Sequence, residues 1–249
     1  MNMPLVSIVI SSYNYGQYLP EAIESALGQT HGSVEVVVVD DGSHDDSVEV
    51  AGRYPVRVIV QPNQGVSSAR NRGAAECSGQ YIMFLDADDV LEAGYVENCL
   101  QALVAAPPRV VYAYTRMRYF GAEERVWNSR PFDAGALLRG NFVHASALIR
   151  HRVFKESGGF DTRWRLGHED YELWVRLLKL GYQGVLVPEP LLWYRRHVKS
   201  RNTLTKKQLR QLKWQMRMAY PKFYWWKILT HPIAAIYWAV RHRRLWREE

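Results

Sequence analysis

Short apolar runs alternate with amphipathic segments along the first third of the chain. Continuous β-branched runs at Val6–Ile10 and Val34–Val39 predict strands that are buried on both faces of a parallel sheet. Between them, apolar residues recur every four positions over Pro20–Gln29, which predicts a helix with one buried face. The chain is therefore expected to open with a strand–helix–strand unit.

The same alternation continues to about residue 90. Val56–Gln61 and Tyr81–Leu85 predict two further strands, and Ser67–Ala75 between them predicts a helix. Strands that alternate with helices indicate an α/β fold with a mainly parallel, doubly wound sheet. Such sheets bind ligands at the carboxyl ends of their strands.

After Asp89 the pattern is less regular. It predicts two helices, over Tyr95–Ala105 and Glu169–Leu180, and three strands, over Val110–Tyr119, Ala145–Ile149 and Gly184–Val187. We expect one domain over residues 1–203, with halves that meet near residue 105, and a separate tail over residues 204–249.

Composition narrows the class of protein. Hydrophobic residues make up 47% of the 249 residues, which is enough for a sizeable core and excludes a disordered chain. Cys77 and Cys99 have no partners at metal-ligand spacing, so we expect reduced thiols. The N-terminus lacks the basic region and cleavage site of a secretory signal, which favours a cytoplasmic location.

The tail differs in charge from the rest of the chain. Residues 199–249 contain 13 Lys and Arg, two acidic residues and five of the nine tryptophans, whereas the remainder has 19 basic and 23 acidic residues. Lys206–Tyr220 has apolar positions at helical spacing, and no uninterrupted apolar run reaches the ~20 residues that span a bilayer. We expect a helical amphipathic extension on an anionic membrane surface. Packing of these helices on the domain or on a second subunit is the alternative.

Polar residues follow the first two predicted strands. Ser11-Ser12-Tyr13-Asn14 stands where a Rossmann dehydrogenase would carry a Gly-rich fingerprint, and an aromatic residue there suits a flat base. Asp40-Asp41-Gly42-Ser43 offers carboxylates to base or ribose donors. Each motif alone is equally well read as a turn. Their coincidence at adjacent strand ends favours nucleotide binding.

Asp86-Ala87-Asp88 closes the fourth predicted strand. Residues two apart on an extended chain point the same way, so the two carboxylates form an oxygen site for Mg²⁺ or Mn²⁺. The alternative is that Asp88 or Asp89 caps the helix that follows.

Two later motifs also carry titratable groups. Glu169 and Asp170 open a predicted helix, where acidic residues are favoured by the helix dipole but also suit a general base. His197 follows Arg195 and Arg196, a neighbourhood that suits phosphate binding.

Taken in order, these motifs resemble those of the family 2 glycosyltransferases, which have the GT-A fold. The resemblance covers residues 6 to about 200. It is carried by Val6–Asn14, Ala26–Thr30, Val39–Ser43, Asn63–Asn71, Phe84–Asp89, Gly158–Asp161 and Glu169–Trp174.

The resemblance implies roles for particular residues. Those that match contacts to the nucleotide sugar are Ser11, Tyr13, Asp40, Asp41, Arg70 and Asp86. Asp88 matches the metal ligand, and His197 matches, more loosely, a late His that assists metal or diphosphate binding. Asp170 matches the catalytic base, with Glu169 beside it.

The implied enzyme is an inverting hexosyl or N-acetylhexosaminyl transferase of the bacterial surface-polysaccharide type. Its donor would be a nucleotide sugar, most often a UDP-sugar, and its cofactor Mn²⁺ or Mg²⁺. Residues 1–105 would bind the nucleotide and residues 106–203 the acceptor, a saccharide or lipid-linked saccharide. The tail, residues 204–249, would then hold the enzyme peripherally on the cytoplasmic face of the membrane.

Three other functions fit the sequence less well. A sugar nucleotidyltransferase would carry a Gly-rich, basic loop after the first strand, which here reads Ser-Ser-Tyr-Asn-Tyr-Gly. A catalytically inactive nucleotide-sugar binder would have lost one of the two acidic motifs, and both are present. Nucleic acid is not an expected partner, because the first 198 residues are acidic overall.

Overall fold

The computed structural model describes residues 3–127, 129–198 and 205–224, and the chain divides into two compact units, Met1–Asn202 and Thr203–Glu249. In the first unit the strands are β1 (Val6–Ser12), β2 (Val34–Asp40), β3 (Arg57–Val60), β4 (Tyr81–Asp86), β5 (Val90–Leu91), β6 (Val110–Gly121), β7 (Arg125–Trp127), β8 (Leu148–Arg150) and β9 (Gln183–Arg196). Its helices are α1 (Leu19–Leu27), α2 (Ser47–Ala51), α3 (Val66–Ala75), α4 (Tyr95–Ala105), α5 (Ala134–Arg139), α6 (His151–Glu156) and α7 (Glu169–Lys179).

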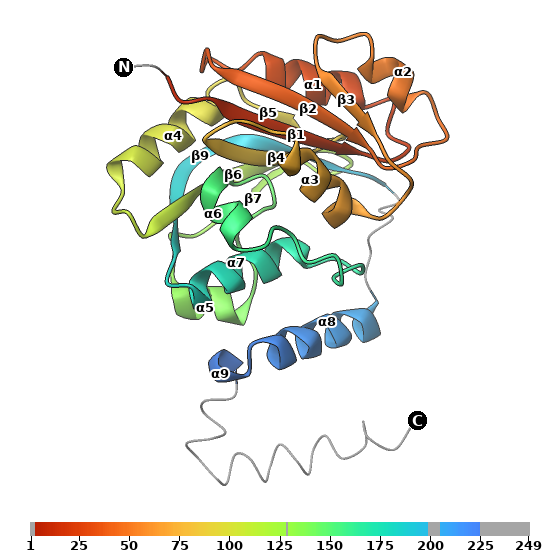
Figure 1. The fold of residues 1–249 in the computed structure, drawn as a ribbon. Coiled ribbons are helices and arrows are strands. Elements are labelled where there is room, and N and C mark those ends of the chain that lie inside the picture. Colours follow the sequence, from red (N-terminus) through yellow and green to blue (C-terminus); the bar gives the residue numbers. More distant parts are fainter. Residues whose placement is uncertain (1–2, 128, 199–204, 225–249) are drawn as a thin grey trace, which may run out of the picture. The chain divides into compact units, whose positions relative to one another are not determined.

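All the strands belong to one sheet, in the order β3-β2-β1-β4-β8-β6-β9-β5, with β7 paired to β6 (Figure 1). The pairings among β1 to β4 are parallel, as the β-branched runs predicted. Beyond β4 the sheet is mixed, because β8 runs antiparallel to both β4 and β6 whereas β6 and β9 are parallel. The predicted α/β fold is confirmed, and its mainly parallel character holds for the first half.

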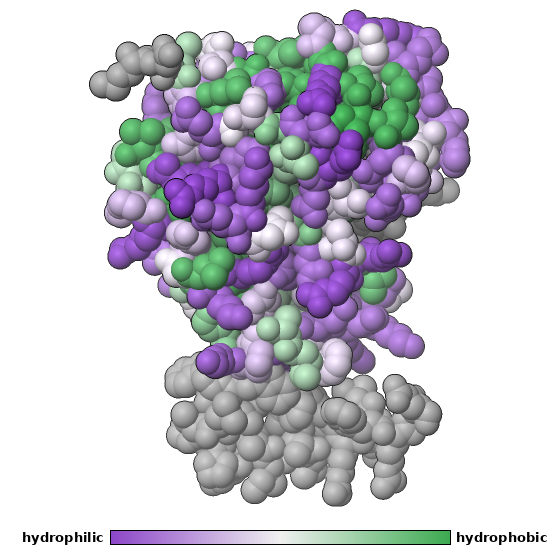
Figure 2. Space-filling model, viewed as in Figure 1, coloured by the Kyte–Doolittle hydropathy of each residue, from purple (hydrophilic) through white to green (hydrophobic). Residues whose placement is uncertain are grey.

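Helices cover both faces of the parallel half. On one face, Ile8 and Ile10 of β1 share a buried core with residues of α1 and α4. On the other face, a Cβ on Gly73 of α3 would overlap the side chain of Val9, so the glycine allows the helix to approach the sheet closely. Figure 2 shows that the outer face of the described residues mixes hydrophilic residues with smaller hydrophobic patches.

Some elements departed from the sequence-based expectation. From β1 to β6, each predicted helix and strand was found with both ends within two residues of the prediction. The short elements α2, β5, β7, α5 and α6 were not predicted. The strand β9 extends to Arg196, well past the predicted end at Val187. Pro188 and Pro190 interrupt the apolar pattern there, and the pairing with β6 shifts register at the same point.

The described part of the second unit is helical. The helix α8 (Lys206–Ala219) is capped by Thr205, whose hydroxyl accepts a hydrogen bond from the backbone N–H of Gln208 at 3.2 Å. Pro221 opens the short helix α9 (Pro221–Tyr224). The predicted amphipathic segment Ile233–Trp246 lies outside the described residues. Among the described helices, none is both long and apolar enough to cross a membrane.

Candidate active site

Neighbouring strands end together at the carboxyl edge of the sheet. In the register of β1, Ser11 lies beside Asp86 of β4, and Ser12 lies beside Asp40 of β2. The first three predicted motifs therefore meet at one edge, as expected for strands of a parallel sheet.

The Asp40 and Asp41 carboxylates are buried and organise the surrounding loops. Asp40 Oδ2 accepts hydrogen bonds from the backbone N–H groups of Gly42 at 3.1 Å and Ser43 at 2.9 Å, which is the geometry of a turn. Its Oδ1 is buried without a hydrogen-bond partner among the described residues. Asp41 Oδ2 accepts from the backbone N–H of Gly65 at 2.8 Å, just before α3. Both residues thus shape the loops of this edge.

Tyr13 lies on the exposed side of the same edge, with 37% of its surface accessible. The next residue, Asn14, has a positive φ of 57°. Its side chain accepts a hydrogen bond from the backbone N–H of His44 at 2.8 Å, and its own backbone N–H donates to Ser43 Oγ at 2.9 Å. The loops after β1 and β2 are therefore joined, and Tyr13 remains available to a flat ligand.

Arg70 of α3 connects the two acidic motifs. Its Nη2 lies 2.6 Å from Asp86 Oδ1, and its Nη1 lies 2.8 Å from Glu169 Oε1 at the start of α7. The residue is only 2% exposed, and its guanidinium lies 5.2 Å from the centre of the Phe160 ring. Burial alone would lower the pKa of Arg70, but the Asp86 and Glu169 carboxylates raise it further above its ordinary value, so the group is a permanent cation.

Asp170 is the neighbour of Glu169 in the first turn of α7. Asn141 Nδ2 donates to its Oδ2 at 2.9 Å, and the backbone N–H of Tyr171 donates to its Oδ1 at 2.7 Å. Burial and the Glu169 carboxylate raise the pKa of Asp170 to about 7. A carboxylate with a pKa near neutrality is suited to general base catalysis.

Asp88, the last residue of the Asp86-Ala87-Asp88 motif, forms a pair with His197. The distance from His197 Nε2 to Asp88 Oδ2 is 2.7 Å. The rings of Tyr15 and Tyr18 pack against the imidazole, with centroid distances of 6.0 Å and 5.3 Å. Burial, and then the Asp86 carboxylate, raise the pKa of Asp88. Within the described residues, no group of three or more His, Cys, Asp or Glu is arranged to hold a metal ion.

Three contacts of the candidate site were not predicted from the sequence. Asn141 lies in a loop 29 residues from Asp170, and no motif marks it. Buried Asp89 accepts a hydrogen bond from the backbone N–H of Arg195 at 2.9 Å, and Arg195 Nε donates to the Asp88 carbonyl at 3.0 Å. These bonds fix the Asp86–Asp89 turn to the end of β9.

Comparison with known sequences identifies the family. The model described as "Glycosyl transferase family 2" matches residues 7–171. An uncharacterised glycosyltransferase of Haemophilus influenzae is 32% identical over 196 residues, which are 75% of this chain and 76% of the relative. The chondroitin synthase of Escherichia coli is 32% identical over 188 residues, or 72% of this chain and 27% of the synthase. A Rickettsia typhi glycosyltransferase is 31% identical, and the match spans 60% of its length.

Solved structures share the fold. TarS residues 1–349 from S. aureus, in complex with UDP, superposes with a TM-score of 0.64 at 17% identity, over 77% of this chain and 60% of that 1–349 chain. A mannosyltransferase of Pyrobaculum calidifontis, in complex with GDP-Man and Mn²⁺, gives 0.59 at 19% identity, over 81% of this chain and 59% of the other.

The sheet, with acidic residues gathered at its carboxyl edge, has the GT-A fold, and the family match makes the chain a glycosyltransferase. The chain belongs to glycosyl transferase family 2. The family predicted from the ordered motifs is thereby confirmed, and the match extends into α7, as far as Tyr171.

Proposed function

We propose that the protein transfers a sugar from a nucleoside diphosphate sugar, with UDP as the nucleotide, to an acceptor hydroxyl with inversion at the anomeric carbon. The observation that carries this proposal is the junction of the Asp86–Asp88 motif with the Glu169–Asp170 pair through Arg70. It supports the proposal because a carboxylate of near-neutral pKa then lies close to the acidic motif that is proposed to bind the diphosphate. The UDP, UDP-GlcNAc and GDP-Man complexes of structures with this fold support a nucleotide-sugar donor.

In the proposed reaction Asp170 takes the proton from the acceptor hydroxyl as its oxygen attacks the anomeric carbon. The bond between that carbon and the diphosphate oxygen breaks as the new bond forms on the opposite face. The nucleoside diphosphate leaves with the electron pair, and the anomeric configuration inverts. Asn141 orients the Asp170 carboxylate by donating to Oδ2 at 2.9 Å.

Asp88 and His197 are the residues that fit a divalent cation. Their oxygen and nitrogen atoms lie 2.7 Å apart and are ligand types that Mn²⁺ accepts. A pair to which the described residues add no third ligand suits a cation whose coordination is completed by substrate phosphates, as is common for Mg²⁺. When bound, such an ion neutralises charge on the leaving diphosphate.

The nucleoside is proposed to bind at the carboxyl edge of β1 and β2. Tyr13 would stack on the base, with Ser11 beside it. Asp40 Oδ1, buried without a described partner, and the second lone pair of Asp41 Oδ2 would accept its donors. Asp86, whose side chain is 39% exposed, would accept from the ribose.

The acceptor is proposed to be a saccharide or a lipid-linked saccharide. Chondroitin and hyaluronan synthases are among the relatives, and both names describe polysaccharide synthesis. The basic residues of 204–249 support a peripheral position on an anionic, cytoplasmic membrane face.

A donor screen tests the proposal. The full chain is incubated with Mn²⁺ or Mg²⁺ and a panel of nucleotide sugars, and release of nucleoside diphosphate is measured with and without saccharide acceptors. Release from one donor that requires the cation and is lost in Asp88→Ala is the expected result. Turnover by Asp88→Ala at the wild-type rate would contradict the assigned ligand. Absence of both release and nucleotide binding for every donor would contradict the function.

A further inference from the structure

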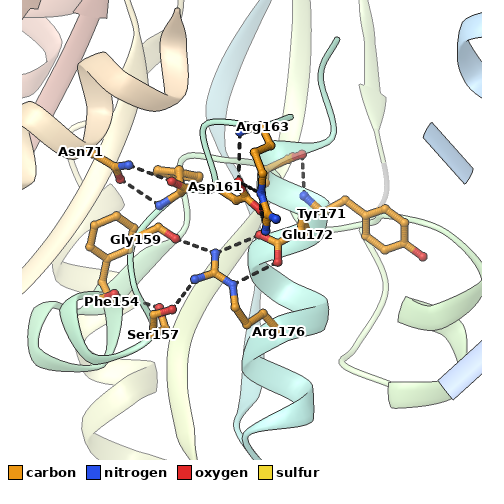
Figure 3. A network of polar contacts seen from close by, with 11 residues as sticks. Asn71, Phe154, Ser157, Gly159, Asp161, Arg163, Tyr171, Glu172 and Arg176 are labelled. Atoms are coloured by element: carbon orange, nitrogen blue, oxygen red, sulfur yellow. Dashed lines mark hydrogen bonds and ion pairs between the residues drawn. The ribbon is translucent and has the colours of Figure 1, made fainter. Parts of the chain in front are cut away.

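The helices α3 and α7 are clamped together by a turn between α6 and α7. Asn71 of α3 exchanges two hydrogen bonds with the backbone of Phe160, donating to its carbonyl at 2.7 Å and accepting from its N–H at 2.8 Å. Arg176 of α7 donates to the carbonyl of Gly159 at 2.5 Å and pairs with Glu172 at 2.9 Å (Figure 3). The turn at Gly159 and Phe160 is thus bonded to both helices and bridges them.

This clamp holds Arg70 opposite the first turn of α7. Arg70 precedes Asn71 in α3, and its Nη1 lies 2.8 Å from Glu169 Oε1 at the start of α7. The two ion pairs of Arg70 occupy both of its terminal nitrogens, and its Nε is buried without a described hydrogen-bond partner. These contacts favour a role for Arg70 in positioning the two carboxylates over the nucleotide contact that the family resemblance implies.

Glu169 and Asp170 are adjacent carboxylates with different partners. Arg70 binds Glu169, whereas Asp170 is held by the neutral amide of Asn141. A carboxylate in an ion pair with a guanidinium is committed to that pair, whereas one held by a neutral amide remains able to accept a substrate proton. The different partners therefore favour Glu169 as the ion-pair partner of Arg70 and Asp170 as the residue that accepts a proton.

We propose that Arg70 is a positioning residue, which holds Glu169 as its fixed anionic partner, leaves Asp170 as the single base, and ties both to Asp86 of the diphosphate motif. Glu169 then acts through Asp170 and does not itself take the acceptor proton. The inference rests on the proposed transferase function. It adds to that function a division of labour between the two carboxylates.

The test compares Glu169→Gln and Arg70→Lys with wild type and with Arg72→Lys. Arg72 lies on the same helix, is more than half exposed and pairs only with Glu76 among the described residues, so its variant is a matched control. Each protein is assayed for kcat and donor KM between pH 5 and 9. In parallel, the titration of the Asp170 carboxyl carbon is followed by NMR, which needs no turnover.

The expected results differ for each variant. Loss of the Glu169 charge should lower the pKa of Asp170, so the acid limb of kcat and the NMR titration move to lower pH by about one unit. A lysine cannot span both carboxylates, so Arg70→Lys should lower kcat about tenfold or more with donor KM nearly unchanged. A protein that carries both Glu169→Gln and Arg70→Lys should lose no more kcat than Arg70→Lys alone.

Two results would overturn the inference. One is an Asp170 titration that Glu169→Gln leaves unchanged. The other is a folded Arg70→Lys protein with wild-type kcat and a raised donor KM, which would mark Arg70 as a nucleotide contact. If Arg70→Lys does not fold, the Glu169→Gln titration decides alone. Absence of turnover in wild type would contradict the transferase function and would leave the NMR comparison valid.

Discussion

Asp170 is half-buried at the start of α7, and its carboxylate accepts hydrogen bonds on both oxygens. Burial and the charge of Glu169 act in the same direction on its pKa, and these hydrogen bonds oppose them only in part. The Asp170 carboxyl, with its pKa of about 7, is therefore about half ionised near pH 7, which suits the base proposed for the reaction. At this scale, partners distant in the chain decide what each carboxylate does.

Replacing Asp170 by Asn should abolish turnover and spare binding. The amide has nearly the same shape but accepts no proton, so we expect kcat to fall by a factor of about 10² to 10⁴. Nucleoside diphosphate affinity, measured by calorimetry with Mn²⁺, should stay close to that of wild type. Rates near those of wild type would show that another group is the base.

The pH dependence of kcat should follow the Asp170 titration. The base works only when ionised, so below its pKa of about 7 the rate should fall about tenfold per pH unit. The bond from Asn141 lowers the pKa of Asp170, so Asn141→Ala should move this acid limb to higher pH. The measurement is kcat at saturating donor from pH 5 to 9. A limb that is identical in the two proteins would show that Asn141 does not tune the base.

At the scale of elements, the turn at Gly158–Asp161 sets the spacing of α3 and α7. Gly159 has φ +68°, and a Cβ built on it would lie 2.6 Å from Asn71 Oδ1. Gly181, after α7, also has a positive φ of +88°, but a Cβ there would meet nothing within 4 Å. Alanine substitutions at the two glycines therefore distinguish the cost of backbone strain, which both share, from the cost of steric overlap, which only Gly159 has.

Gly159→Ala should destabilise the protein more than Gly181→Ala. Strain at a positive φ costs about 1 kcal/mol in both, and displacement of the Asn71 side chain adds about 1 to 2 kcal/mol at Gly159. Urea unfolding of the two variants and wild type measures the difference in free energy of unfolding. Equal losses would mean that Asn71 does not hold the turn.

At the scale of the whole molecule, the charge of the chain is divided between an acidic domain and a basic tail. Residues 199–249 carry 13 basic residues and two acidic ones, along with five tryptophans. Basic segments bind anionic lipid with about 1 kcal/mol for each Lys or Arg near the surface. This supports the proposal that the tail is the membrane-binding part of the protein.

Flotation with vesicles tests this proposal. The full chain should float with vesicles that contain anionic lipid, and less so at high salt, because screening weakens the attraction. A form truncated at Thr203 should remain in the lower fractions. Equal flotation of both forms would refute the assignment, and neutral vesicles serve as the control for apolar binding alone.

The sequence by itself determined the parallel half of the sheet, its helices and the order of the acidic motifs. Strands that are buried on both faces have continuous β-branched runs, and helices have apolar residues at three- and four-residue spacing. Both patterns involve only residues close together in the sequence, so they can be recognised without the tertiary structure. The family resemblance followed from the same local segments.

The tertiary structure decided which motifs touch. Arg70 and Glu169 are 99 residues apart, Asp88 and His197 are 109 apart, and neither pairing has a signature in the local pattern. The insertion of β8 between β4 and β6, and the contact of Asn141 with Asp170, likewise depend on how the chain returns to the sheet. Local residue types fix what each segment forms, whereas packing between segments sets the charge, burial and partner of each side chain.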